Sequence, residues 1–183
     1  MKVLVIGSGG REHAIAYALN KSQKVDEIHA IPGNPGMAEI GTCHPGHVED
    51  LDSILKFVEE HAIDFTVIGP EVPLCMGLAD LLESHGHKVF GPTKQAATLE
   101  GSKAFSKDFM KRHHIPTAAY QEVHSYEEAI EALTSFDYPV VVKADGLAAG
   151  KGVVICENES QAKLALQEMM IEGALDGAGK TVV

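Results

Sequence analysis

Short apolar runs that each end at a glycine or a proline recur through the first ninety residues of the chain. They cover residues 2–6, 27–31, 65–68 and 88–90. The stretches between them have helical spacing of apolar residues, which is clearest over residues 51–58 and also predicts a helix over residues 74–84. Alternating strands and helices are typical of parallel sheets with right-handed crossovers. The sequence therefore predicts an α/β fold, with a doubly wound, Rossmann-like parallel sheet in a domain of residues 1–101.

Three glycine-bearing loops follow the first, second and third of these runs, at residues 7–10, 32–36 and 69–71. In a parallel sheet the carboxyl ends of the strands share one edge, where ligands collect. The first loop leads into a helix and carries Arg11, a combination that suits a single phosphate. The alternative interpretation is a tight strand–helix turn with a surface arginine.

A dinucleotide site is disfavoured. The third glycine of the usual fingerprint falls at Glu12, and residues 32–34 replace the acidic residue that would hold a ribose.

The pattern changes after Gly101. A helix is expected over residues 94–114 with an interruption at Gly101, and residues 102–117 form a helical linker. Residues 118–183 then predict a small α+β unit, with strands at 118–123, 139–143 and 153–156 and helices at 126–133 and 160–170.

The most distinctive segment lies inside this second unit, at residues 140–155. It predicts a strand, a glycine-rich loop and a second strand. Gly146, Gly150 and Gly152 leave backbone N–H groups free to face phosphate oxygens, while Lys143 and Lys151 supply positive charge. A glycine, rather than Ser or Thr, follows Lys151, so this is not the usual phosphate loop. A nucleotide-binding flap is favoured over a plain hairpin.

Other basic residues give weaker signals. Lys103 lies early in a helix, where it could reach a bound anion, although by itself it suggests surface. Lys107, Lys111 and Arg112 suggest a solvated helix face.

The net charge of −11 argues against nucleic acid as a partner, and no apolar stretch is long enough for a membrane span or a secretion signal. Three scattered cysteines without a C-x-x-C pair suggest reduced thiols in the cytoplasm. A zinc site at Cys43, His44 and His47 is disfavoured, because no second ligand cluster is near in sequence.

Six segments together resemble the phosphoribosylamine–glycine ligase family (glycinamide ribonucleotide synthetase) of the ATP-grasp superfamily. They are VIGSGGREHA (5–14), PGNPG (32–36), VIGPEVPL (67–74), FGP (90–92), SKAF (102–105) and KADGLAAGKGV (143–153). The flap segment alone indicates only the wider superfamily.

The resemblance implies a reaction of de novo purine biosynthesis. ATP phosphorylates the carboxylate of glycine, and 5-phosphoribosylamine attacks the glycyl phosphate to give glycinamide ribonucleotide, ADP and phosphate. It implies ATP contacts at Lys103, Lys143, Asp145, Gly146, Gly150, Lys151 and Gly152, with residues 148–153 as a mobile loop. It implies phosphoribosylamine contacts at Gly9, Gly10, Arg11, Glu12, Gly33, Asn34, Gly69, Pro70 and Glu71.

Family members are more than twice as long, so the chain is expected to be an N-terminal fragment that is inactive alone. The ligands of the Mg or Mn ion and most of the glycine pocket are expected beyond Val183, with the lid subdomain of residues 118–183 truncated. The alternatives are another ATP-grasp carboxylate–amine ligase of nucleotide biosynthesis and a noncatalytic nucleotide-binding module.

Overall fold

A computed structural model describes residues 1–148, 151–173 and 179–183 of the chain. The chain divides into two compact units, residues 1–97 and 98–183, and the division falls inside α6 (Lys94–Gly101). Within the described ranges, no helix has the length and apolar character needed to cross a bilayer.

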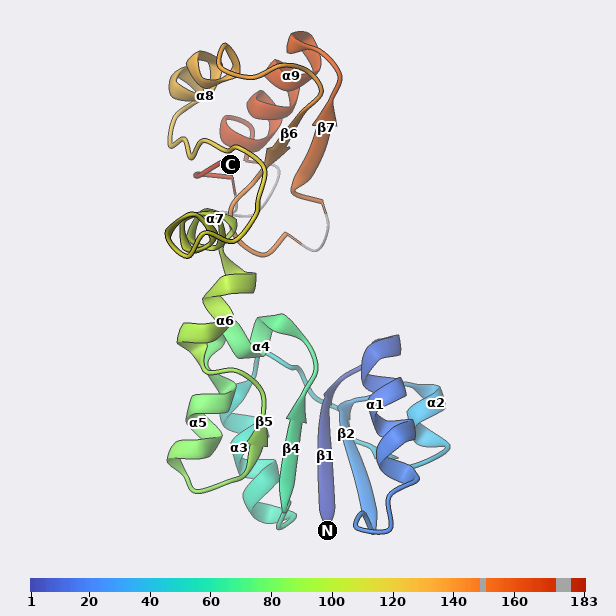
Figure 1. Cartoon of the computed structure of the whole chain (residues 1–183). Coiled ribbons are helices and arrows are strands. Elements are labelled where there is room, and N and C mark those ends of the chain that lie inside the picture. The colour runs from blue at the N-terminus through green and yellow to red at the C-terminus, as the bar shows by residue number, and fades with distance from the viewer. Residues whose placement is uncertain (149–150, 174–178) are drawn as a thin grey trace. The chain divides into compact units, whose positions relative to one another are not determined.

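The first unit is built on a five-stranded parallel sheet (Figure 1). Its strands are β1 (Lys2–Gly7), β2 (Glu27–Pro32), β3 (Thr42–Cys43), β4 (Phe65–Ile68) and β5 (Val89–Phe90). Their order in the sheet is β3-β2-β1-β4-β5, and every pair is parallel. Because β1 is central, the chain winds outward from it in both directions, which confirms the predicted doubly wound α/β fold.

Helices cover both faces of this sheet because successive residues of a buried strand point to opposite sides. Leu4 and Ile6 of β1 belong to the core under α3 (Leu51–Glu60) and α5 (Leu78–Ser84). Val5 belongs to the core under α1 (Gly10–Asn20) and α2 (Pro35–Ala38). The predicted helical stripe over residues 51–58 faces the first of these cores.

The single helix predicted for residues 74–84 is wrong in detail. The structure has α4 (Glu71–Met76) and α5, which meet at Gly77. Gly77 has φ 101° and ψ 26°, a left-handed conformation that ends α4, and its N–H donates to the Pro73 and Leu74 carbonyls. Glycine reaches this conformation without the steric cost that other residues incur, so the chain turns here and starts a new helix.

The second unit contains α7 (Lys103–Arg112), α8 (Tyr126–Leu133), β6 (Val140–Lys143), β7 (Val153–Cys156) and α9 (Glu159–Met170). The interruption predicted at Gly101 is confirmed, since α6 ends there and α7 begins after Ser102. β6 and β7 form an antiparallel pair. One face of the pair packs Val142 and Cys156 against Ala129 of α8 and Leu166 of α9.

The strand predicted for residues 118–123 is wrong except at its last residue. Val123 exchanges both backbone hydrogen bonds with Val182, at 3.0 Å each, and Val183 does the same with Lys143 of β6 at 2.8 Å. Residues 181–183 therefore lie between Val123 and β6. Among the described residues no strand lies opposite residues 118–122, so these residues have no ladder to join.

Candidate functional site

The predicted phosphoribosylamine contacts lie together at the carboxyl edge of the parallel sheet. β1, β2 and β4 end at Gly7, Pro32 and Ile68 as adjacent strands, and the three glycine-bearing loops follow directly. Backbone hydrogen bonds connect the loops to the neighbouring strand ends, from Gly33 N–H to Gly7 O (3.2 Å) and from Gly69 N–H to Ile6 O (3.1 Å). The parallel register therefore brings together residues more than fifty positions apart in sequence.

Glu12 lies at the centre of this edge with only 4% of its surface exposed. Its Oε2 accepts the Gly9 N–H at 2.8 Å, and its Oε1 accepts Arg11 Nε–H at 3.0 Å. A Cβ atom added to Gly69 would lie 2.3 Å from Glu12 Oε1, and one added to Gly7 would lie 2.6 Å from Glu12 Cγ. The buried carboxylate therefore requires glycine at position 69, and at Gly7 it adds to the requirement of a left-handed backbone, with φ 119°.

Asn34 ties the first two loops together. Its Nδ2 donates to Ser8 O at 2.9 Å, and its Oδ1 accepts the Met37 N–H at 2.9 Å as the N-cap of α2. The Asn34 side chain thus accepts a hydrogen bond from the first turn of α2 and also fixes the spacing between the loops that follow β1 and β2.

Arg11 is the exposed cation of this edge, with 64% of its side chain accessible. The hydrogen bond to Glu12 is the main cause that raises the pKa of Arg11, with smaller contributions from the charges of Glu12 and Glu71. Glu71 Oε2 lies 3.7 Å from Arg11 Nη2. The space above Gly10 is open, since a Cβ there would meet no atom within 4 Å. An anion could therefore approach the α1 N-terminus beside Arg11.

The predicted ATP contacts that the structure describes lie at one end of the second unit. Lys143 ends β6, Gly152 precedes β7, and Ala144 N–H donates to Gly152 O at 2.8 Å. Lys103 is the first residue of α7, and its Nζ donates to Gly146 O at 2.8 Å. Lys151 N–H donates to Ala148 O at 2.8 Å. Gly150, also predicted as an ATP contact, lies outside the described residues.

Asp145, another predicted ATP contact, accepts hydrogen bonds from the start of α7. Its Oδ1 accepts the Lys103 N–H at 2.6 Å and the Ala104 N–H at 3.1 Å, and its Oδ2 accepts Ser102 Oγ–H at 3.1 Å. The carboxylate thus faces the start of α7. Sequence reasoning missed this contact because the partners are more than forty positions apart.

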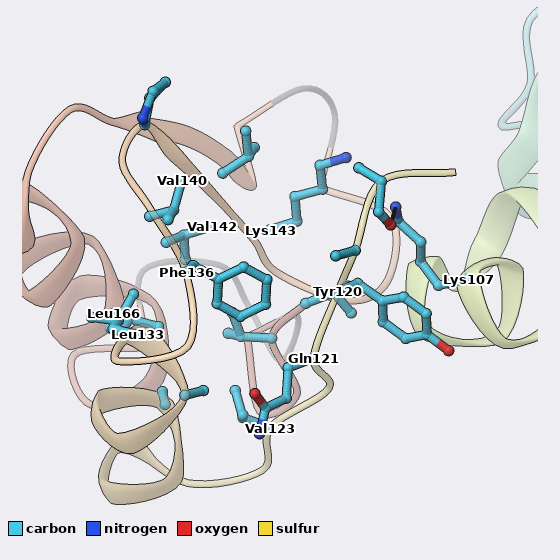
Figure 2. Close-up of a pocket in the computed structure, with 18 of the residues that line it drawn as sticks. Lys107, Tyr120, Gln121, Val123, Leu133, Phe136, Val140, Val142, Lys143 and Leu166 are labelled. Carbon is cyan, nitrogen blue, oxygen red and sulfur yellow. Dashed lines mark hydrogen bonds between the residues drawn. The ribbon is translucent and has the colours of Figure 1, made fainter. Parts of the chain in front are cut away.

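A pocket of about 350 Å³ lies beside β6 and is lined by Val140, Val142, Phe136, Leu133 and Lys143 (Figure 2). The segment 118–121 forms its other wall. Lys107 also lines it, donating through Nζ to Thr117 Oγ1 at 2.7 Å and to Ala118 O at 3.1 Å.

Lys107 corrects the predicted solvated helix face. Burial lowers the pKa of Lys107, and the charge of Lys143 lowers it further. The sequence did contain a signal for this position. Lys107 follows Lys103 by one helical turn, so the two lysines lie on the same side of the helix. Lys111 and Arg112 are exposed as predicted.

The outer face of the β6–β7 pair is apolar and accessible. Val141 pairs with Ile155 and Lys143 pairs with Val153, so these four side chains share a face. Ile155 is 64% exposed, Val141 44% and Val153 43%. An accessible apolar surface bordered by a lysine and a glycine-rich segment suits a planar base that carries phosphates. In the part of the chain that the structure describes, no group of three His, Cys, Asp or Glu side chains is arranged to hold a metal ion.

The parallel α/β unit, followed by a small unit with a lysine-bearing glycine-rich hairpin, defines the chain as an ATP-grasp protein. Residues 1–100 match the family profile described as phosphoribosylglycinamide synthetase, N domain, and residues 101–183 match its ATP-grasp (A) domain. The chain belongs to the phosphoribosylglycinamide synthetase family.

Relatives and solved structures agree with this assignment. The chain is 46% identical to the phosphoribosylamine–glycine ligase of Clostridium acetobutylicum and 49% identical to that of Agrobacterium fabrum, over all of this chain and 44% and 43% of those proteins. The crystal structure of the Thermotoga maritima phosphoribosylamine–glycine ligase matches with a TM-score of 0.82 and 37% identity, covering 100% of this chain and 42% of that one. The chain therefore spans less than half the length of these relatives.

Proposed function

We propose that this chain supplies the N-terminal part of an ATP-dependent ligase that joins glycine to 5-phosphoribosylamine in purine biosynthesis. The observation that carries the proposal is the match of both units, over the whole chain, to two successive domains of one ligase family. The geometry supports it, because each unit has its own place for an anion.

The reaction has two chemical steps. An oxygen of the glycine carboxylate attacks the γ-phosphorus of ATP, the bond to the β–γ bridging oxygen breaks, and ADP leaves. The amine of 5-phosphoribosylamine then attacks the carbonyl carbon of glycyl phosphate. The carbon–oxygen bond to phosphate breaks, the amine loses a proton, and glycinamide ribonucleotide and phosphate result. A carboxylate needs this activation because its own oxygen is a poor leaving group.

In this proposal the first unit holds the phosphoribosyl group. The residues involved are Gly9, Gly10, Arg11, Glu12, Gly33, Asn34, Gly69, Pro70 and Glu71. The α1 N-terminus and Arg11 would receive the phosphate, where backbone N–H groups and a guanidinium suit an anion. Glu12 would hold Gly9 and Arg11 in place, since its buried carboxylate accepts hydrogen bonds from both.

The second unit would hold ATP. Lys103, Lys143, Lys151, Gly146, Gly150 and Gly152 are the proposed contacts to phosphate, and Lys107 adds a further positive charge near Lys143. These lysines supply local positive charge, although the net charge of the whole chain is −11. The exposed face of Val141, Val153 and Ile155 would contact the base.

A divalent cation, Mg²⁺ or Mn²⁺, would offset charge on the transferring phosphoryl group. We place its ligands, with most of the glycine pocket, in the part of the relatives that this chain does not cover. The three free cysteines are consistent with a cytoplasmic location.

The proposal is tested by titrating the isotope-labelled chain separately with ribose 5-phosphate, a stable probe of the phosphoribosyl site, and with ATP. Ribose 5-phosphate is expected to shift backbone resonances at Gly9, Gly10 and Arg11, and ATP those at Lys143 and Gly152. Inorganic phosphate is the control for nonspecific anion binding. Shifts by both probes in the same unit would contradict the assignment of one substrate to each unit.

Catalysis is tested separately by ADP release. The 183-residue chain is expected to release no ADP in response to glycine and a source of 5-phosphoribosylamine, because we place the metal ligands and most of the glycine pocket in the part of the relatives that this chain does not cover. Glycine-dependent ADP release by this chain alone would show that its own residues complete the active site.

A further inference from the structure

Backbone N–H groups at the start of α7 donate hydrogen bonds to a side chain from a distant segment. A helix leaves its first N–H groups without intrahelical partners. Ser102 Oγ accepts the third of them, from Phe105, at 3.0 Å. Asp145 Oδ1 accepts the first two, from Lys103 and Ala104, and Asp145 Oδ2 accepts the Ser102 hydroxyl. The carboxylate therefore completes the N-cap and places a negative charge at the positive end of the helix dipole.

A second contact connects the same two segments. Lys103 Nζ donates to Gly146 O at 2.8 Å, next to the Asp145 contact. The beginning of the glycine-rich segment is thus joined to the beginning of α7 by four hydrogen bonds over two consecutive residues. Asp145 N–H also donates to Thr181 O at 2.8 Å, which fixes the backbone on its other side.

We propose that Asp145 is a positioning residue that holds Lys103 and Gly146 in the arrangement that receives ATP phosphates. This inference rests on the proposed ATP site and goes beyond it, because it removes Asp145 from the group that contacts ATP. Both carboxylate oxygens already accept hydrogen bonds, and a carboxylate repels phosphate. Asp145 acts on ATP through Lys103 and Gly146.

The direction of the change in ATP affinity distinguishes a positioning role of Asp145 from mere proximity to the ligand. A carboxylate that only lies near a polyphosphate weakens its binding by repulsion, so removing it strengthens binding. A carboxylate that positions a lysine has the opposite effect, because its loss frees Lys103 and Gly146 to adopt other conformations. Asp145→Ala is therefore expected to weaken ATP binding although it removes a negative charge.

The positioning contact is measured first, by amide hydrogen exchange on the 183-residue chain. The Lys103 and Ala104 amides are expected to be protected in the wild-type chain and to exchange about tenfold faster or more in Asp145→Ala, since hydrogen bonds to charged groups are among the stronger ones. Asn158→Ala is the matched control, because Asn158 caps α9 in the same unit through Gln161 N–H at 3.1 Å. It should leave both amides unchanged.

The consequence for the ligand is measured by titrating ATP into the same variants. Asp145→Ala is expected to raise the apparent Kd for ATP about tenfold, because Lys103 and Gly146 must then be ordered when ATP binds. Asp145→Asn is expected to bind ATP at least as tightly as wild type. Its Oδ1 can accept the same two N–H groups and its Nδ2 can donate to Ser102 Oγ, while the charge is gone. Asn158→Ala should retain wild-type affinity.

Each outcome decides one claim. Unprotected Lys103 and Ala104 amides in the wild-type chain overturn the inference, and this measurement needs no variant to fold. Tighter ATP binding by Asp145→Ala overturns it as well, because Asp145 is then a bystander charge. If the wild-type chain shows no ATP-dependent shifts in the second unit, the proposed ATP site fails for this chain, whereas the exchange data still decide whether Asp145 holds α7.

Discussion

The buried side chain of Glu12 determines which residues can occupy the positions around it. Its buried carboxylate fills the space that a Cβ would need at Gly7 and Gly69, and it binds the Gly9 N–H and the Arg11 guanidinium. The glycines of these loops are usually attributed to the close approach of a ligand. Here the Glu12 side chain already accounts for three of them, at positions 7, 9 and 69, and the space above Gly10 is the part left open to a ligand.

This packing predicts a coupling between Glu12 and Gly69. Gly69→Ala should lower the free energy of unfolding by about 1–3 kcal/mol, the usual cost of forcing atoms into a filled site. In a Glu12→Ala background the same change should cost much less, because the overlapping carboxylate is gone. Urea unfolding of the two single variants and the double variant measures the coupling. Gly10→Ala, which meets no neighbouring atom, is the control; equal costs in both backgrounds would refute the packing argument.

A group of histidines predicts how stability responds to pH. His29 Nδ1 and His44 Nε2 lie 3.0 Å apart, and the His44 and His61 ring centroids lie 5.6 Å apart. Burial lowers the pKa of His44, and the charges of His29 and His61 lower it further.

Because the folded-state pKa of His44 is depressed, the stability that it contributes is complete above the unfolded-state value of about 6.5 and is lost as the pH falls below it. Urea unfolding between pH 7.5 and 5 should show this decrease, and His44→Leu should reduce it. An unchanged pH slope in His44→Leu would exclude His44 as its source.

At the scale of elements, the β6–β7 pair has two faces with different roles. Val142 and Cys156 point into the core with α8 and α9, whereas Val141, Val153 and Ile155 are accessible. In a two-stranded sheet covered by helices on one side, an apolar outer face stabilises the fold little. We attribute it to ligand contact.

Ile155→Ser should therefore change the free energy of unfolding by about 1 kcal/mol or less, since an exposed strand position contributes little packing. It should nevertheless weaken ATP binding measurably in a resonance titration. Leu164→Ser, on the exposed side of α9, is the matched control and should leave ATP binding unchanged. If Ile155→Ser and Leu164→Ser bind ATP with the same affinity, the β6–β7 face is not part of the proposed site.

At the scale of the whole molecule, the two units have separate hydrophobic cores. Ile54 and Leu82 belong to a core that contains only residues of the first unit, and Leu166 and Val142 belong to one that contains only residues of the second. A chain with independent cores unfolds as separate cooperative units unless the interface between them is large.

Two variants test this independence. Ile54→Ala and Leu166→Ala each remove a fully buried side chain and should cost about 2–5 kcal/mol. In calorimetry, Ile54→Ala should lower the melting temperature of one transition and Leu166→Ala that of the other. A single transition that shifts equally in both variants would show that the two cores unfold together.

Local patterns in the sequence located most of the secondary structure, whereas the ligand contacts of the two candidate sites stay predictions. The apolar runs at β1, β2 and β4 and the stripe of α3 are set by burial periodicity, which a short window displays. The break at Gly77 was missed because glycine is tolerated inside helices as well as at their ends, and the sequence does not say which conformation it adopts. Residues 118–122 have strand composition, but a strand also requires a partner.

What the sequence alone determined is the order of strands, helices and glycine-bearing loops, because periodicity and turn chemistry act over a few residues. The tertiary structure decided which distant groups meet. It places the Glu12 carboxylate against the loop after β4, the Asp145 carboxylate on the start of α7, and Lys107 near the charge of Lys143. These contacts depend on chain packing across tens of residues, and hydrogen bonds and charges respond to distance in space, which sequence separation does not reveal.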